Sequence, residues 1–394
     1  MGVIRYLKGL FAPPPAYAPP RPDEGADKKL GSALLDNLIG VRAMFTDSGD
    51  LIIHEVQVCG VPCAVLMCEG MVNTQTFSEM FAEPLTRLRL EKPGPDSVLD
   101  WVRHQSLLAP DQKEIHTFGE LFRFMMSGFV VLLIDGIAGG SVFGIQGFSG
   151  RSVGEPAGET NVRGSREGFS EMLRPNMSLL RRRFKSPDLI FEMTVFGDKS
   201  RTDCTIVYLR GAVSDELLRE VKYRLSKVKI DVVLESGYLQ PFLDSKPLSL
   251  FSGVGVTERP DTLCAKVAEG RVGLLVDGTP YALIVPYLFA ENFQSLDDYS
   301  HRPYFATFIR WLKYAAFALS ILLPGLYVAV GSFHPELLPA TILTSLVVSE
   351  ETTPFPLMFE ALAVFFIYEI VREAGLRMPQ AVGHAVSIVG ALVI

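Results

Sequence analysis

The alternation of apolar and polar residues divides the chain into two parts near Tyr304. Between about Leu30 and Asp298, short apolar runs alternate with amphipathic stretches. Strand character is found in LIIHEVQV, PCAVLMC and CTIVYLRG, and helical period in TFSEMFAEPLTRL, FGELFRFMMS and SDELLREVKYRLSKV, where Ser214 is the expected N-cap. This mixture of strands and helices predicts a layered α/β region.

The α/β region contains an internal similarity. GFVVLLIDG (128–136) and GRVGLLVDG (270–278) match at Gly, Val, Leu, Leu, Asp and Gly, and each follows an amphipathic helix and precedes another apolar stretch. An Asp-Gly pair between apolar runs is typical of a hairpin turn. We therefore expect two related subdomains, with Asp135 and Asp277 as turn residues rather than catalytic acids. Convergent use of one helix-strand-turn pattern is the alternative.

The segment that connects the two halves begins polar and continues as an amphipathic helix, in which Pro175 is expected to cause a kink or a break. The helix ends in Arg181-Arg182-Arg183, which we interpret as a basic helix end rather than a phosphate site. Clefts between subdomains are common ligand sites. Four residues of this segment are candidates to line such a cleft, with ion pairing between the subdomains as the simpler interpretation: Arg151, Glu159, Arg163 and Arg166.

After Tyr304 the chain becomes strongly apolar. Tyr314 to Ser332 is a run of nineteen residues without charge, long enough to cross a bilayer. Basic residues precede this run and acidic residues follow it, so the positive-inside rule predicts that the α/β region lies in the cytosol. A second apolar segment runs from Leu357 to about Ala374, and residues 335–348 between them have the character of an interfacial or re-entrant helix.

These patterns predict four regions. Residues 1–29 form a proline-rich N-terminal linker, residues 30–150 the first cytosolic α/β subdomain, residues 151–303 the second, and residues 304–394 an α-helical membrane domain. The final apolar stretch reaches Ile394 without a polar flank. We therefore expect the membrane domain to be incomplete, as in a fragment or a truncated gene product.

Three carboxylates lie in or near the second apolar segment: Glu360, Glu369 and Glu373. Acidic residues within a bilayer are energetically costly, so they face protein or water rather than lipid. One interpretation is that Glu360 caps a helix and Glu369 pairs with a basic neighbour. The other is that at least one of the three faces a pore or a subunit contact.

Composition excludes several classes of function. The net charge is −7 and no long basic run is present, so nucleic acid is not an expected partner. The five cysteines without a secretory signal indicate reduced thiols, and the spacing of Cys59, Cys63 and Cys68 matches no standard zinc site. The six histidines stand in no recognised catalytic motif. We therefore expect no metal, no cofactor and no enzymatic activity.

The chain resembles the GerA-type A-subunit family of spore germinant receptors, which includes a sporulation-stage-V paralogue. The resemblance runs from about Leu35 to the end of the chain. It is densest in RSVGEPAGETNVRGSREGFSEMLRPNMSLLRRRF, TERPD, EGRVGLLVDGTPYALIVP, SLDDY, LPGLYVAV and residues 354–394.

The resemblance implies a subunit of the inner spore membrane that acts with a transporter-like B subunit and a lipoprotein C subunit. It also implies self-association into a ring that conducts ions when nutrient is sensed, with Glu360, Glu369 and Glu373 in a stretch suited to an oligomeric channel. An accessory ion channel of the same family, which amplifies germination, is the alternative. A membrane-anchored enzyme and a small-ligand site in the α/β region are the remaining hypotheses.

Overall fold

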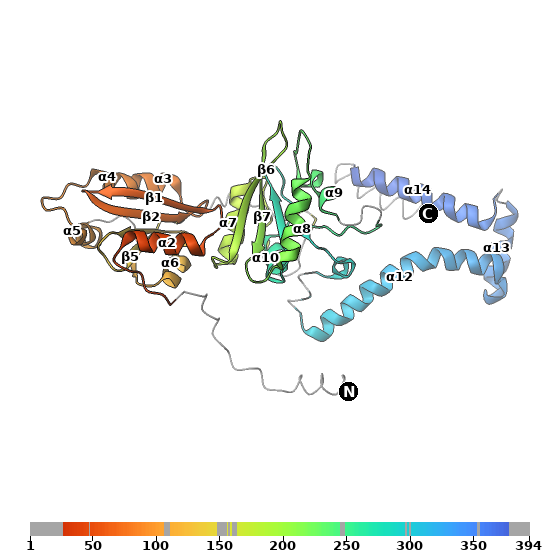
Figure 1. Cartoon of the computed structure of the whole chain (residues 1–394). Helices are drawn as coiled ribbons and strands as arrows, with labels where there is room; N and C mark the ends of the chain where they lie inside the picture. Colours follow the sequence, from red (N-terminus) through yellow and green to blue (C-terminus); the bar gives the residue numbers. More distant parts are fainter. Residues whose placement is uncertain are drawn as a thin grey trace. The chain divides into compact units, whose positions relative to one another are not determined.

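The computed structural model describes residues 27–46, 48–105, 111–147, 156, 158–159, 164–244, 249–295, 298, 301–352 and 355–377. The chain divides into two compact units, Met1–Asn292 and Phe293–Ile394. The first unit contains two five-stranded sheets, and the second is helical (Figure 1).

The first subdomain is a five-stranded antiparallel sheet in the order β1-β2-β4-β5-β3. Its strands are β1 (Leu51–Val58), β2 (Val61–Cys68), β3 (Gln112–Ile115), β4 (Phe129–Ile134) and β5 (Gly140–Gly144). Its helices are α2 (Leu34–Met44), α3 (Thr74–Thr76), η1 (Phe77–Ala82), α4 (Glu83–Arg87), α5 (Pro95–Asp100), η2 (Trp101–Gln105) and α6 (Phe118–Met125).

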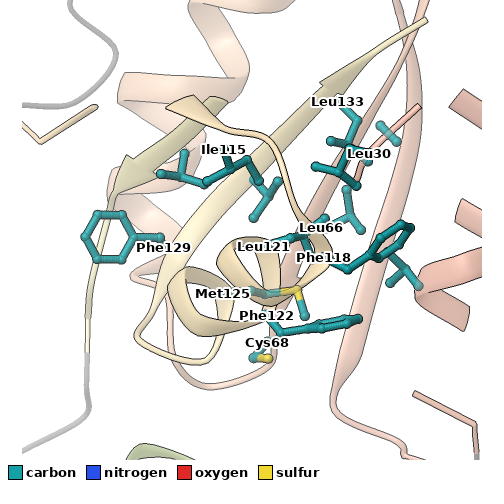
Figure 2. Packing of buried hydrophobic residues seen from close by; sticks show 14 of the residues in the cluster. Leu30, Leu66, Cys68, Ile115, Phe118, Leu121, Phe122, Met125, Phe129 and Leu133 are labelled. Atoms are coloured by element: carbon teal, nitrogen blue, oxygen red, sulfur yellow. The ribbon is translucent and has the colours of Figure 1, made fainter. Parts of the chain in front are cut away.

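Helices cover both faces of this sheet. On one face, Leu66 of β2 and Leu133 of β4 pack with Phe118 and Leu121 of α6 and with residues of α2 (Figure 2). On the other face, alternate residues of the same strands pack against η1, α4 and α5. Because β4 is buried on both faces, its sequence FVVLLI is continuously apolar rather than alternating.

The second subdomain repeats this strand order as β6-β7-β9-β10-β8, again antiparallel throughout. Its strands are β6 (Leu189–Phe196), β7 (Thr202–Leu209), β8 (Gly255–Thr257), β9 (Val272–Val276) and β10 (Ala282–Val285). Its helices are α7 (Leu173–Arg183), α8 (Asp215–Ser226), η4 (Ser236–Tyr238), α9 (Gln240–Leu243), α10 (Pro260–Ala268) and η5 (Phe289–Phe293), which reaches into the second unit. Helices α7 and α10 cover one face, and α8 and α9 the other.

The two Asp-Gly turns confirm that the subdomains share one plan. The Asp135 carboxylate accepts a hydrogen bond from the Leu34 amide at the start of α2, at 2.9 Å. Asp277 accepts the equivalent bond from Leu173 at the start of α7, also at 2.9 Å. Each carboxylate therefore caps the first helix of its own subdomain, a role that the turn alone did not indicate. The hairpins expected after both turns are present as β4–β5 and β9–β10.

Helix α7 differs from the sequence-based expectation at its start. Pro175 neither kinks nor breaks it, because the helix begins only two residues earlier, at Leu173. The N–H groups of the first helical turn have no acceptor within the helix, so a proline at this position costs no helical hydrogen bond. Phe169 precedes the helix but is still buried in the core beneath it.

The second unit contains α12 (Pro303–Phe333), η6 (Pro335–Leu337), α13 (Ala340–Thr352) and α14 (Leu357–Arg377). Of the helices described, α12 is the one long and apolar enough to cross a membrane, by length and composition. It carries Pro324 in its interior. Helix α14 covers the second apolar segment and packs against α12.

Candidate functional site

A buried ion pair joins the two subdomains. The Arg181 guanidinium donates to both carboxylate oxygens of Asp50, at 2.8 and 2.9 Å, and the two side chains are 1% and 3% exposed. The same guanidinium donates to the carbonyl oxygens of Ser186 and Leu189 and lies 4.7 Å from the ring centre of Phe191. An ion pair so completely buried and hydrogen-bonded fixes the subdomains against each other.

Backbone contacts reinforce this junction. The Gly49 amide donates to the Phe191 carbonyl at 2.8 Å, and Arg210 donates to the carbonyls of Met44 and Thr46. From the sequence, Arg181 was interpreted only as part of a basic helix end, and Asp50 was not identified. A usable signal was present, because Arg181 falls four residues after Met177 on the apolar face of α7, where an arginine needs a buried partner.

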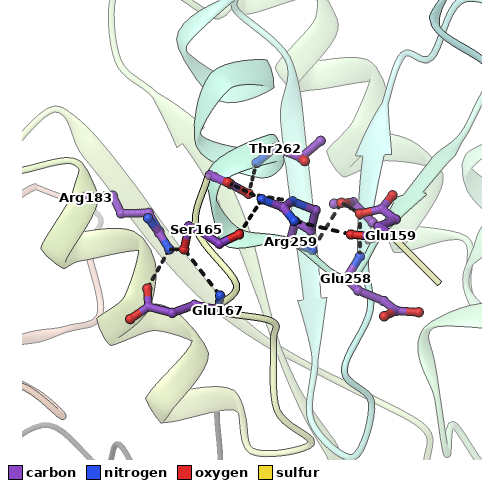
Figure 3. Close-up of polar contacts among 9 residues, drawn as sticks. Glu159, Ser165, Glu167, Arg183, Glu258, Arg259 and Thr262 are labelled. Atoms are coloured by element: carbon purple, nitrogen blue, oxygen red, sulfur yellow. Dashed lines mark hydrogen bonds and ion pairs between the residues drawn. The ribbon is translucent and has the colours of Figure 1, made fainter. Parts of the chain in front are cut away.

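A second polar cluster holds the connecting segment against the TERPD sequence (Figure 3). The Arg259 side chain is 3% exposed and donates to the carbonyl oxygens of Glu159 and Ser165, at 3.2 and 2.9 Å. It also donates to both carboxylate oxygens of Asp261, at 3.1 and 2.6 Å. One buried arginine therefore anchors two points of the segment to the start of α10.

Glu159 is part of this cluster. Its carboxylate accepts from the Thr257 hydroxyl at 2.6 Å and from the Glu258 amide at 3.3 Å. Burial raises the pKa of the Glu159 carboxyl, and these two hydrogen bonds partly oppose that shift. These contacts are all with residues of the second subdomain. Arg166 is exposed, and Arg151 and Arg163 lie outside the described residues.

The end of α7 also holds the connecting segment. Arg182 and Arg183 both form ion pairs with Glu167, and Arg183 also donates to the Ser165 hydroxyl at 2.9 Å. The basic cluster therefore does end α7, as expected, and two of its arginines bind carboxylate and hydroxyl groups of the segment that leads into the helix.

Glu360 lies at a hollow of about 410 Å³ between α12 and α14. Pro324 and Tyr327 of α12 and Tyr368 of α14 line it together with apolar side chains. A carboxylate and two phenol rings thus line one apolar hollow, a combination suited to a cation.

Glu369 and Glu373 lie farther along α14. Glu369 pairs with Arg372 on the next turn, and both side chains are substantially exposed. Glu373 is exposed as well. The three candidate acids thus differ in their surroundings. Glu360 lines the hollow. Glu369 pairs with a basic neighbour, as the first of the two interpretations expected for that residue.

The cysteines are free thiols. Burial raises the pKa of Cys63 to about 11, and those of Cys204 and Cys264 to about 12, so these thiols stay protonated at neutral pH. Their role is that of small apolar side chains in the core. Within the described parts of the chain, no cluster of three or more His, Cys, Asp or Glu residues has the geometry of a metal site.

Comparison with known proteins identifies relatives along most of the chain. Residues 40–394 match the model of the GerA family, described as Bacillus/Clostridium GerA spore germination protein. The chain is 36% identical to spore germination protein KA of Bacillus subtilis over 93% of its own length and 67% of that protein. It is 32% identical to spore germination protein GerLA of Bacillus cereus, over 93% of this chain and 74% of that one.

A solved structure is also similar. It is the crystal structure of the N-terminal domain of the A subunit of the Bacillus megaterium spore germinant receptor GerK3, with a TM-score of 0.54 and 26% identity. The match covers 67% of this chain and 98% of that domain. Two antiparallel sheet subdomains, a match to the family model over most of the length and relatives above 30% identity agree: the chain belongs to the GerA family of spore germination proteins.

Proposed function

We propose that this chain is the A-type subunit of a spore nutrient-germinant receptor and that it couples nutrient sensing to ion release. Membership of the GerA family and similarity to proteins named as spore germination proteins support a role in germination. Similarity to the N-terminal domain of a receptor A subunit supports the specific assignment.

The observation that carries the ion-conducting part of the proposal is the hollow at Glu360. A carboxylate beside an apolar hollow between α12 and α14 costs free energy unless it meets a cation, water or a partner group. In our proposal α12 and α14 belong to a membrane domain, copies of the subunit assemble into a ring, and Glu360 faces the ion path or the contact between subunits. Glu369 and Glu373 are the further candidates for these positions.

The receptor that we propose lies in the inner membrane of the spore, with the α/β region in the cytosol. Its other members are a transporter-like B subunit and a lipoprotein C subunit. An accessory channel that amplifies germination is the second possibility, because it would share this fold and the same acidic positions.

The first test is to delete the full-length gene and to follow potassium release from spores exposed to each nutrient germinant. A receptor subunit predicts that the response to one class of nutrient disappears while the others persist. An accessory channel predicts slower release for every nutrient. Unchanged release with all nutrients contradicts both roles.

A second test addresses Glu360 directly. In full-length protein restored to the deleted strain, Glu360→Gln removes the charge but keeps the size of the side chain. If Glu360 stabilises a passing cation by about 1.4 kcal/mol, the initial rate of potassium release falls about tenfold. Glu336→Gln is the control, since Glu336 is exposed in η6, outside the hollow. Equal rates for both variants at equal protein levels contradict a role for Glu360 in conduction.

A further inference from the structure

The second subdomain exposes apolar side chains on two neighbouring loops. Leu250 and Phe251 precede β8, and Leu288 and Phe289 follow β10; their exposed fractions are 96%, 47%, 55% and 41%. The rings of Phe251 and Phe289 contact each other, with centroids 4.4 Å apart. We refer to these four residues as the loop patch. A contiguous exposed patch of this kind is typical of a surface that meets a partner or a membrane.

The fold brings the two loops together at one end of the sheet. Strands β8 and β10 pair antiparallel, with Gly255 opposite Ile284, so the chain entering β8 lies beside the chain leaving β10. The Tyr287 amide donates to the Gly253 carbonyl at 2.8 Å and joins the loops directly. Strand pairing and this hydrogen bond therefore hold the two loops together, so that the four side chains form one patch.

The corresponding end of the first subdomain is also built from an antiparallel strand pair. Strands β3 and β5 pair in the same way, and the adjoining described residues are Asp111 before β3 and Ile145, Gln146 and Gly147 after β5. Ile145 is 3% exposed and belongs to the core.

Three charged groups near the patch, Glu291, Lys266 and Arg271, are paired with one another. Glu291 is buried, accepts hydrogen bonds from Lys266 at 2.8 Å and Arg271 at 2.9 Å, and accepts another from the Leu288 amide at 2.7 Å. The last bond fixes the backbone from which Leu288 and Phe289 project. These charges can therefore approach a medium of low dielectric constant as a neutralised cluster.

A short piece of chain joins the patch to Phe293, the first residue of the second unit. Phe289 is four residues before Phe293, and four residues reach at most about 14 Å when fully extended. The Phe293 ring packs on Tyr314 and Phe317 of α12, with centroids at 4.3 and 5.3 Å. Tyr314 is the first residue of the uncharged run of α12, and Lys313 immediately precedes it. If α12 crosses the bilayer, as the proposed function requires, Tyr314 marks the water–lipid interface.

We propose that the loop patch inserts into the interfacial layer of the bilayer and docks the second subdomain on the membrane surface. The interfacial layer is about 5–8 Å thick on each side, so a patch tethered within about 14 Å of Phe293 can reach it. Aromatic and leucine side chains on loop tips with neutralised neighbours match the chemistry of that layer. This inference rests on the membrane role of α12 in the proposed function.

Tryptophan fluorescence in the full chain tests this proposal. The chain has two tryptophans, Trp101 in the first subdomain and Trp311 in α12. The protein is reconstituted in vesicles of phosphatidylcholine and phosphatidylglycerol that carry a quencher close to the headgroup. One variant, Trp101→Phe, leaves Trp311 as the reporter of α12. In a second, both tryptophans become Phe and Phe251→Trp reports on the patch.

The matched control carries Tyr223→Trp in the same tryptophan-free background, because Tyr223 is 56% exposed on α8 and is not a residue of the patch. We expect the lipid quencher to reduce the emission of the Phe251→Trp protein at least twofold and to leave the control at its aqueous level. Adding Leu250→Glu, at a position 96% exposed and therefore neutral for folding, should remove at least half of that quenching.

Three results overturn the proposal, and they differ from one another. Quenching of Trp311 but not of the Phe251→Trp protein leaves α12 in the bilayer and rejects lipid docking of the patch. Shielding of the Phe251→Trp protein from aqueous acrylamide without lipid quenching points instead to a second copy of the chain on the patch. Absence of quenching at Trp311 rejects the membrane placement of α12 and, with it, the premise of both proposals.

Discussion

The two subdomains have the same strand order, and α6 of the first corresponds to α10 of the second. The residue that precedes this helix differs between them. In the first, Thr117 caps α6 locally, its hydroxyl accepting from the Glu120 amide at 3.2 Å. In the second, Arg259 occupies the N-cap of α10 and binds the connecting segment instead. The repeated positions maintain the sheet and its helices, whereas Arg259 holds the segment that leads into the second subdomain.

The largest effect is expected where the two halves meet. Arg181→Met leaves Asp50 buried without its partner, which should lower the free energy of unfolding by about 3–5 kcal/mol. Urea denaturation of the chain in detergent, followed through Trp101, measures this loss. The control Arg42→Met removes an ion pair whose two side chains are 60% exposed and should cost less than about 1 kcal/mol. Equal losses would mean that the junction contributes little to stability.

A smaller and symmetrical effect is expected at the repeated caps. Asp135→Ala and Asp277→Ala each remove one side-chain acceptor from a helix N-terminus, at a cost of about 1 kcal/mol. Hydrogen exchange should show faster exchange in α2 for the first variant and in α7 for the second. If either variant changes both helices equally, the halves do not behave as separate stability units.

The smallest effect concerns pH. Burial raises the folded-state pKa of Glu159 above its unfolded value, so the folded state binds the proton more tightly. The resulting stabilisation is present below the unfolded pKa, about 4.3, and is lost as pH rises through the folded pKa. Between pH 4 and 7.5, the chain should therefore lose stability relative to Glu159→Gln. A gain relative to that variant as pH rises contradicts the assignment.

Local patterns in the sequence were sufficient for much of the fold. The apolar runs and the Asp-Gly pairs predicted both hairpins and the repeat, because hairpin chemistry lies in adjacent residues. Ser214 was recognised as the N-cap of α8 for the same reason, and its hydroxyl accepts from the Leu217 amide at 3.2 Å.

Long-range pairings could not be predicted in this way. Asp50 and Arg181 are 131 positions apart, and neither neighbourhood specifies the other. Pro175 was misjudged because a proline has opposite consequences in the first turn and in the interior of a helix. The N-cap residue Met172 provides no side-chain cap that would mark the helix start in the sequence. Glu159 was identified as a candidate, but its contact with Thr257 depends on where the connecting segment folds back, 98 residues before that strand.

The caps at Asp135 and Asp277 also affect when the capped helices can fold during synthesis. Each first helix receives its cap from a residue more than one hundred positions later, 101 in one subdomain and 104 in the other. During translation, α2 therefore receives its cap only after the β4–β5 turn has left the ribosome, and α7 only after the β9–β10 turn has left it. The first half can be complete while the second is still being made, and both can be complete before the uncharged stretch of α12 emerges. Both subdomains can thus be folded before the apolar helices of the chain leave the ribosome.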